Sequence, residues 1–266
     1  MDCRKKLDER LRHPAAGIMD ARTTLHQFAL VNYAVSSEKL AATIPDSRFE
    51  VMRFPTSAGP RAFFSAVLFL DVDFCFSRLA PCIKLKFYQT NHRAYVRDKN
   101  TDEPVVWFWG TNLGSSLVNL PRLLWKIPWH NTDYTVDCRF NPAARRYEKY
   151  SYHFQSDFCR GRVELRDTGE PLKVLDGFSS LDEMKLILTQ PVRGFYQRLD
   201  GRTGTYQIWH PEMHCTLGVA DDLYFSLYER LGLLDAEQQQ RPHSIFLCPQ
   251  ILFNVQLPPQ LVGGGC

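Results

Sequence analysis

Short apolar segments that alternate with polar residues and turns run along most of this chain. Strand-like segments cover residues 25–35, 61–74, 81–96, 104–110, 147–158, 161–166, 195–210 and 246–255. Helix-like spacing and capping residues instead mark residues 37–44, 115–125, 180–189 and 221–231. Period-two alternation is typical of strands, whereas apolar residues three or four apart are typical of helices. The pattern predicts a mainly β (α+β) fold, one closed or strongly curved antiparallel sheet with a few short helices at its rim.

The two ends of the chain differ in character from the middle. Residues 1–22 begin with a heavily charged segment and predict a flexible arm, and residues 258–266 end in Gly-Gly-Gly-Cys and predict a flexible tail. Residues 23–257 contain no repeat, long linker or low-complexity segment. Because the chain of 266 residues is within the size range of one large β-rich domain, we expect a single domain over this range.

Composition and charge exclude several classes of function. The chain is 44% hydrophobic with a net charge of +3, too mild for the dense basic surface expected of a nucleic-acid-binding protein. It has no secretory signal and no run of about 18 apolar residues, so we expect no membrane partner. Eight scattered cysteines without a C-x-x-C pair predict reduced thiols in a cytoplasmic protein. A homo-oligomer is compatible with the sequence, but no feature requires one.

A row of polar residues in the segment 89–96 is the strongest chemical signal. Successive side chains of a strand point to opposite faces, so Gln89, Asn91, Arg93 and Tyr95 would share one face. Buried polar groups need partners, and these would come either from a ligand or from an internal network. Arg93 could clamp a carboxylate through its planar guanidinium, and Tyr95 and Gln89 could orient a carbonyl or hydroxyl.

A second candidate is the segment 125–130, Trp-Lys-Ile-Pro-Trp-His, at the end of a predicted helix. Lys126 in an apolar setting could act as an amine nucleophile or a base, or it could simply complement the helix C-terminus. His130 could be a general acid or base, or it could cap a carbonyl.

His210 and His214, four residues apart, form a third candidate. Pro211 argues against a helix there, and the spacing departs from the H-E-x-x-H zinc motif, so we expect His210 to act as an acid or base rather than as a metal ligand. The chain also lacks a phosphate-binding glycine loop, a G-x-S-x-G motif and a dinucleotide fingerprint. These observations predict no metal and no cofactor.

Several of these segments together resemble a known family. Residues 89–96, 104–110, 123–130, 194–199 and 206–210 resemble, in order, motifs of the YqjF-like branch, of unknown function, of the acetoacetate-decarboxylase-like superfamily. The likeness spans residues 25–255 and implies a cone-like β-structure with a central pocket. Acetoacetate decarboxylases carry a Schiff-base lysine in a G-Y-P-K-K segment, whereas Trp129 and His130 follow Pro128 here. Their pocket glutamates have no clear counterpart around residues 89–95.

We therefore expect a cofactor-independent enzyme that acts on a small carbonyl or carboxylate compound, as a cyclase, dehydratase, isomerase or lyase, for example in specialised metabolism. The catalytic residues of this hypothesis are His130, His210, Tyr95 and, for Schiff-base chemistry, Lys126. Its substrate-binding residues, including an apolar wall of tryptophans, are Arg93, Gln89, Asn91, Trp107, Trp109 and Trp129. The alternative is a non-catalytic protein that binds a hydrophobic acid in the same pocket.

Overall fold

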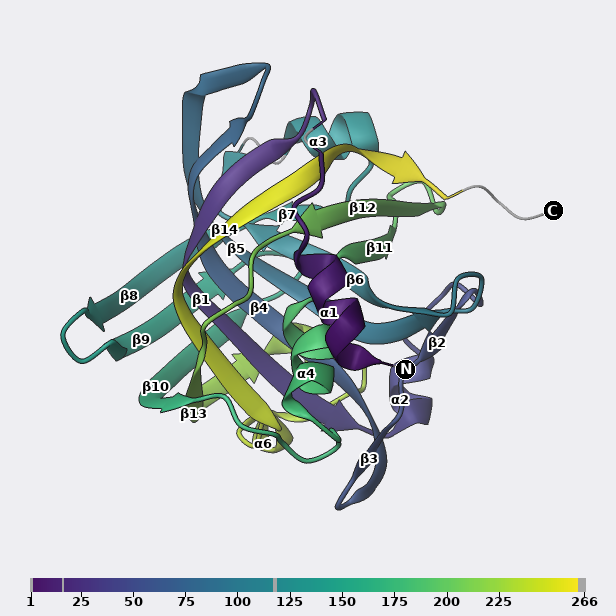
Figure 1. Ribbon diagram of the computed structural model, residues 1–266, viewed down its shortest axis with the longest axis vertical. Coiled ribbons are helices and arrows are strands. Elements are labelled where there is room, and N and C mark those ends of the chain that lie inside the picture. Colours follow the sequence, from purple (N-terminus) through teal and green to yellow (C-terminus); the bar gives the residue numbers. More distant parts are fainter. Residues whose placement is uncertain (1, 16, 117–118, 263–266) are drawn as a thin grey trace.

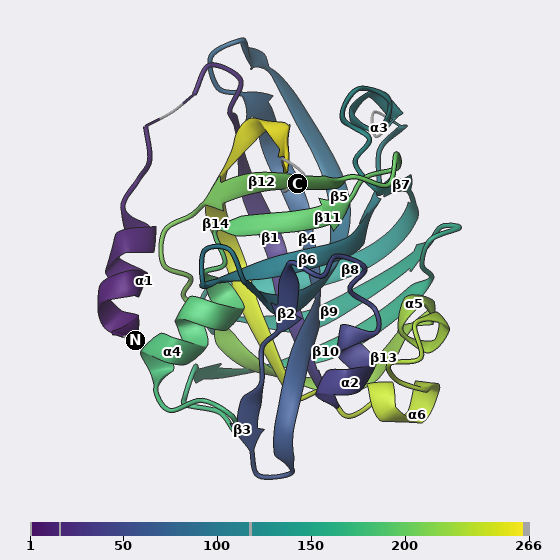
Figure 2. The same ribbon diagram turned by 90° about the vertical axis from the view of Figure 1, so that its right-hand side faces the viewer.

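A closed β-barrel is the centre of the fold, as a computed structural model shows for residues 2–15, 17–116 and 119–262 (Figures 1 and 2). The barrel strands, in spatial order, are β1 (Ala21–Val35), β4 (Gly59–Phe76), β5 (Ala80–Asp98), β6 (Glu103–Leu113), β11 (Arg193–Gln197), β12 (Thr203–Trp209) and β14 (Ser244–Leu261). β14 pairs with β1 and closes the barrel. All these neighbours are antiparallel except β6 and β11, which are parallel. The predicted closed, mainly antiparallel sheet is confirmed.

A second group of strands continues the sheet from β14 and curves along one side of the barrel (Figure 1). In spatial order these strands are β13 (Thr216–Phe225), β10 (Gly161–Pro171), β9 (Arg146–Gln155) and β8 (Asp133–Asn141). Three short strands pair with β5, β4 and β6 respectively: β2 (Phe49–Val51), β3 (Phe54–Thr56) and β7 (Trp129–Asn131).

The helices are short and lie at the edges of the sheet (Figure 2). They are α1 (Cys3–Leu11), α2 (Ser37–Ala41), α3 (Asn119–Trp125), α4 (Leu181–Met184) with the π-helix η2 (Lys185–Thr189), α5 (Ser226–Arg230) and α6 (Ala236–Gln239). None of the helices within the described ranges combines the length and the apolar character needed to cross a bilayer. Ser180 caps α4 by accepting a hydrogen bond from the Glu183 N–H, as its capping motif predicts.

The helix predicted over residues 221–231 is wrong in its first half, because β13 continues to Phe225 and α5 begins only at Ser226. Leu223 and Phe225 are fully buried, while Asp222 and Tyr224 between them are partly exposed. This alternation along β13 outweighs the helical spacing of the leucines, because each of these two side chains fills the core next to the barrel.

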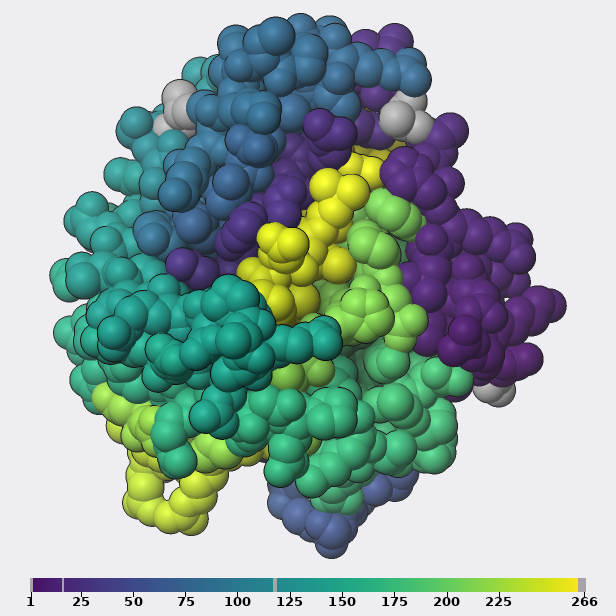
Figure 3. All heavy atoms as spheres, turned by 60° about the vertical axis from the view of Figure 1, so that its left-hand side comes forward, coloured from purple at the N-terminus to yellow at the C-terminus, as the bar shows by residue number. Residues whose placement is uncertain are grey.

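The charged N-terminal segment forms the helix α1 rather than the flexible arm that composition predicted. The atoms of this segment, in dark purple, lie against the green middle part of the chain (Figure 3). Leu7 on α1 is only 1% exposed. The Arg10 guanidinium donates hydrogen bonds to the carbonyl oxygens of Leu186 and Gln190, at 3.1 and 2.7 Å, and so satisfies the end of η2. The expected C-terminal tail is also shorter, because β14 continues to Leu261, while residues 263–266 lie outside the described part of the chain.

The barrel strands carry a different hydrophobic core on each face. Val106 and Phe108 on β6 belong to a core inside the barrel, whereas Val105 and Trp107 belong to a core between the barrel and strands β8, β9, β10 and β13. Successive residues of a strand point to opposite faces, so the position of a residue along β4, β5 or β6 decides which core it joins. The inner face is the one that surrounds the candidate site.

Candidate functional site

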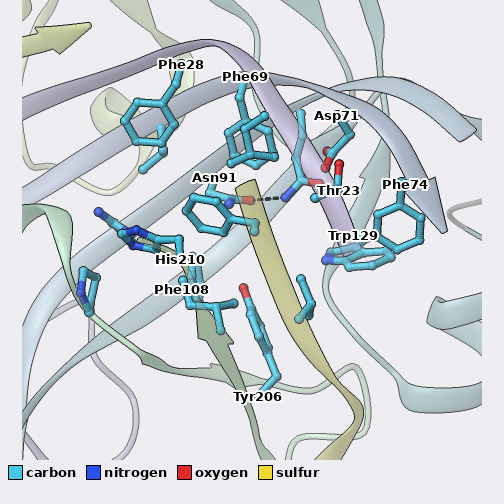
Figure 4. A pocket seen from close by; sticks show the side chains of 18 of the residues that line it. Thr23, Phe28, Phe69, Asp71, Phe74, Asn91, Phe108, Trp129, Tyr206 and His210 are labelled. Carbon is cyan, nitrogen blue, oxygen red and sulfur yellow. Dashed lines mark hydrogen bonds between the residues drawn. The ribbon is translucent and has the colours of Figure 1, made fainter. Parts of the chain in front are cut away.

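A pocket of about 120 Å³ lies inside the barrel and is largely apolar (Figure 4). Its aromatic wall includes Phe28, Phe69, Phe108, Trp129 and Phe253. Its polar groups include Thr23, Asp71, Gln89, Asn91, Arg93, Tyr206 and His210. A dry cavity of about 150 Å³ can hold benzene, so this pocket has the scale of a small organic ligand. A mostly apolar wall with a few convergent polar groups is the usual character of a ligand site.

Three residues of the predicted polar row, Gln89, Asn91 and Arg93, line this pocket from β5. The side-chain nitrogen Nε2 of Gln89 donates a hydrogen bond to Oδ1 of Asn91 at 2.8 Å. Thr111 Oγ1 on β6 donates to the same oxygen, also at 2.8 Å. These bonds fix the Asn91 amide in one orientation, so the middle of the row is ordered by the protein itself.

Arg93 is a buried cation and is only 7% exposed. Its Nη2 donates a hydrogen bond to the Leu188 carbonyl oxygen at 2.9 Å, but its Nε is buried and has no partner. Within residues 2–15, 17–116 and 119–262, no carboxylate forms an ion pair with Arg93. A buried charge without a counter-ion is costly. Arg93 is therefore suited to an anion that enters the pocket.

Tyr95, the fourth residue of the row, shares the Arg93 face but lies behind it rather than on the pocket wall. Its hydroxyl accepts a hydrogen bond from Ser65 Oγ at 2.7 Å and donates one to Asn32 Oδ1 at 3.2 Å. The Arg93 guanidinium carbon lies 5.5 Å from the centre of the Tyr95 ring. The internal-network alternative therefore describes Tyr95, whose position supports Arg93 rather than a ligand.

His210 follows directly after β12, lines the pocket and is 1% exposed. Its Nδ1 lies 2.8 Å from the Pro211 carbonyl oxygen, and its ring stacks on Phe253 with the ring centres 4.4 Å apart. A carbonyl can only accept, so Nδ1 carries a proton, and the Thr189 backbone also acts on the ring. Burial lowers the pKa of His210 to about 4, and the charge of Arg93 contributes in the same direction. His210 is thus a neutral imidazole in the electrostatic field of Arg93.

Asp71 on β4 is a pocket residue that the sequence analysis missed. It is 3% exposed, its Oδ2 has no hydrogen-bond partner, and Thr23 lies beside it (Figure 4). Burial raises the pKa of this carboxyl to about 7, against a smaller opposite effect of the Thr23 hydroxyl. Alternation along β4 could have revealed it, because every second residue of a strand lies on the same face. Val67, Phe69 and Asp71 share the pocket face of this otherwise apolar strand.

The sequence matches the model of the DUF2071 family, described as uncharacterized conserved proteins, over residues 22–251. The chain belongs to the DUF2071 family. No curated protein sequence matches it.

Solved structures extend the comparison of this DUF2071 protein to the fold. Acetoacetate decarboxylase from Legionella pneumophila is 12% identical, with 97% of this chain and 95% of that chain covered and a TM-score of 0.55. The enduracididine biosynthesis enzyme MppR, complexed with pyruvate, is 9% identical, with 94% and 93% covered and the same TM-score. An acetoacetate decarboxylase-like enzyme from Sphingomonas wittichii RW1 is also 9% identical, with 94% and 96% covered and a TM-score of 0.55. The chain therefore has the acetoacetate-decarboxylase-like fold that its motifs indicated.

In this DUF2071 protein, neither Lys126 nor His130 is among the residues that line the pocket. Lys126 follows α3 with a left-handed backbone (φ 54°), and its carbonyl oxygen accepts a hydrogen bond from the Leu199 N–H. His130 stacks on Phe158, with ring centres 4.3 Å apart, and burial lowers its pKa to about 4. Because alternate residues of β7 face opposite sides, Trp129 reaches the pocket and His130 does not. The proposed catalytic roles of Lys126 and His130 have no geometric support.

Of the three tryptophans predicted to form the pocket wall, only Trp129 does so. Trp107 is 1% exposed in the outer core, where its ring centre lies 5.3 Å from that of Phe49. Trp109 packs on the same core, and its Nε1 donates a hydrogen bond to the Thr43 carbonyl oxygen at 3.3 Å. Phe108 between them lines the pocket instead. The prediction for Trp107 and Trp109 was wrong because β6 is buried on both faces.

Proposed function

We propose that this DUF2071 protein is a cofactor-independent enzyme that acts on a small carbonyl or carboxylate compound. The observation that carries the proposal is the buried Arg93 guanidinium, which lines an apolar pocket without a carboxylate partner in the described part of the chain. A substrate carboxylate would supply the missing anion and could form charge-assisted hydrogen bonds with the guanidinium. The apolar wall would exclude water and strengthen this interaction.

His210 is the residue best placed to move a proton near that carboxylate. Its pKa is lowered to about 4 partly by the Arg93 charge, so an anion bound to Arg93 would raise the basicity of the imidazole. Binding of the substrate would thus activate the base, which suits proton abstraction next to a carbonyl, followed by elimination, isomerisation or cyclisation. Because no lysine lines the pocket in the described residues, we propose chemistry without a Schiff base.

The fold comparison supports a keto acid as one substrate class. MppR has been solved with pyruvate, and also with the condensation product of pyruvate and imidazole 4-carboxaldehyde. These are ligands of MppR, and they show that this fold can enclose a keto acid. For the present protein, a keto acid would place its carboxylate on Arg93 and its carbonyl near the His210 and Tyr206 side of the pocket.

A non-catalytic protein that binds a hydrophobic acid is the second candidate, and a specific observation favours it. The aromatic wall offers apolar area, while a base with a pKa of about 4 is a weak proton acceptor unless substrate binding changes it. The two candidates share the role of Arg93 and differ only in whether His210 transfers protons.

The test follows exchange of the hydrogens next to the carbonyl of 2-oxobutanoate in deuterated water by NMR, together with its binding by calorimetry. Arg93→Gln should weaken binding by about 30-fold or more, because a buried charge pair that loses one partner typically loses about 2–5 kcal/mol. His210→Gln should keep binding and lose exchange. Arg97→Gln, on the same strand with a half-exposed side chain, is the matched control and should change neither.

The outcomes separate the candidates. Exchange that depends on both Arg93 and His210 supports the enzyme. Binding that depends on Arg93, without exchange by the wild-type protein, supports the binding protein. Binding or turnover that survives in a folded Arg93→Gln variant contradicts both, because both place the carboxylate on Arg93.

A further inference from the structure

The pocket has a second polar end, far from Arg93. On β4, Ser65 is paired with Arg93 of β5, and Asp71 lies six residues further along. At about 3.3 Å per residue, the Cα atoms of Ser65 and Asp71 are separated by about 20 Å. Figure 4 shows Asp71 and Thr23 on one side of the pocket and His210 on the other. The cation and the buried carboxyl therefore cannot satisfy each other.

The Asp71 carboxyl has fewer hydrogen-bond donors than its two oxygen atoms can accept, because Thr23 is the donor that acts on it and Oδ2 has none. Its Oδ2 is buried without a partner, and the nearby Thr23 hydroxyl, with a single proton, also lies 3.3 Å from the Val72 carbonyl oxygen. Lys86 and Asp73, on the flanking strand segments, instead act on the pKa of His26, which burial lowers. Burial raises the pKa of Asp71, and the Thr23 hydroxyl opposes this effect. This carboxyl is therefore open to a donor that comes from a ligand.

The surroundings of Asp71 favour a donor that is also a cation. The aromatic residues Phe74, Phe87 and Trp129 line the same pocket, and Phe87 is paired with Asp71 across β4 and β5. Figure 4 shows Phe74 and Trp129 on the Asp71 side. A cation beside a carboxylate and aromatic faces is stabilised by both, whereas an apolar tail would leave Oδ2 unsatisfied.

We propose that the ligand carries a protonated amine at the end opposite its carboxylate, and that Asp71 binds this amine while Arg93 binds the carboxylate. The inference rests on the proposed function for the carboxylate end and names the substrate class for the other end. An elongated amino acid of this kind would neutralise both unpaired groups at once. Asp71 would then determine specificity, in addition to Arg93.

The test measures the affinities of the intact protein for four probes of equal length by calorimetry at pH 7.5. The probes are octanoate, 8-aminooctanoate, 7-oxooctanoate and the dicarboxylate suberate, with matched series of six and ten carbons to cover the span. The wild type should prefer the amino acid over the plain acid by about tenfold or more at the best length, and suberate should bind most weakly.

The variants locate that preference. Asp71→Asn should reduce the ratio of the two affinities to about one, because the amide cannot become an anion. Thr23→Val, which keeps Asp71 but removes its donor, should reduce the ratio by a smaller factor and serves if Asp71→Asn does not fold. Asp73→Asn, an exposed neighbour whose side chain is 58% accessible, should keep the full preference.

Three results would overturn this inference: equal affinity for octanoate and 8-aminooctanoate at every length, an undiminished preference in Asp71→Asn, or tightest binding of 7-oxooctanoate, which would make Asp71 a neutral donor. If octanoate binding is lost in Arg93→Gln and no amine preference exists, only this inference fails. If no probe binding depends on Arg93, the proposed function fails as well.

Discussion

Replacement of Asp71 by Asn should stabilise the protein, and increasingly so as the pH rises. The substitution keeps the size of a side chain that is 3% exposed but removes its ability to ionise. Burial raises the pKa of Asp71 to about 7, from an ordinary value of 3.8. The unfolded chain therefore releases this proton at a lower pH than the folded protein does. Between these two pKa values the folded state binds more protons, so the wild type loses stability as the pH rises.

The size of the effect follows from the same two values. Each pKa unit corresponds to about 1.4 kcal/mol, so ionised Asp71 reduces the free energy of unfolding by about 4 kcal/mol at pH 8. About 3 kcal/mol of this loss develops between pH 4.5 and pH 8. Burial lowers the pKa values of His92 and His210, so these two groups reduce the stability of the protein as the pH falls. Their effect therefore has the opposite pH dependence to that of Asp71. The useful quantity is therefore the difference between variant and wild type at each pH.

The assay is urea unfolding of wild type and Asp71→Asn at pH 4.5, 6 and 8, followed by circular dichroism. With a slope of about 3 kcal/mol per molar urea, the midpoint difference should grow in favour of the variant by about 1 M over this range. Asp73→Asn is the control, since its side chain is 58% exposed. A midpoint difference that stays constant from pH 4.5 to pH 8 would show that Asp71 is not held as an unpaired buried acid.

Three further predictions address other parts of the structure. Borohydride treatment with a keto acid should give no covalent adduct in the wild type or in Lys126→Met, by mass spectrometry, because Lys126 does not line the pocket; an adduct lost in the variant would contradict this placement. Phe108→Ala should weaken ligand binding, measured by calorimetry, because Phe108 lines the pocket and Trp107 does not. Trp107→Ala should mainly reduce folding stability, by about 3–5 kcal/mol in urea unfolding. The reverse pattern would mean that the faces of β6 are misassigned. Arg10→Ala should cost about 2–4 kcal/mol in thermal or urea unfolding, because carbonyl groups of η2 lose their donor; an unchanged stability would show that α1 is not docked in solution.

The fold and the central row of the site could be predicted from the sequence because both depend on local alternation. Gln89, Asn91 and Arg93 are polar residues at every second position of an apolar strand, and all three line the pocket. Their register needs no information from distant residues, since a strand places alternate side chains on one face whatever its neighbours are. His210 was named because it follows a predicted strand and because Pro211 argues against a metal-binding helix there.

The errors arose where the environment of both faces matters. Trp107, Phe108 and Trp109 are all apolar, so their sequence cannot say which face meets the pocket and which meets the outer core. Alternation along β4 could have placed Asp71 on the pocket face, but its lack of partners depends on β1 and β5, which no local pattern contains. Arg10 acts on carbonyl groups about 180 positions away in the chain, so composition alone gave a flexible arm in place of α1.

On the barrel strands, the residues that line the pocket and the residues that form the outer core occupy different, alternating positions. On β4, Val67, Phe69 and Asp71 face the pocket, whereas Ala66 and Leu68 belong to the outer core. Substitutions at pocket positions can therefore change the chemistry of the interior while the outer core continues to hold the sheet together. This arrangement suits evolutionary diversification and directed evolution alike, since a library restricted to pocket-facing positions would vary the lining of the pocket and leave the outer core unchanged.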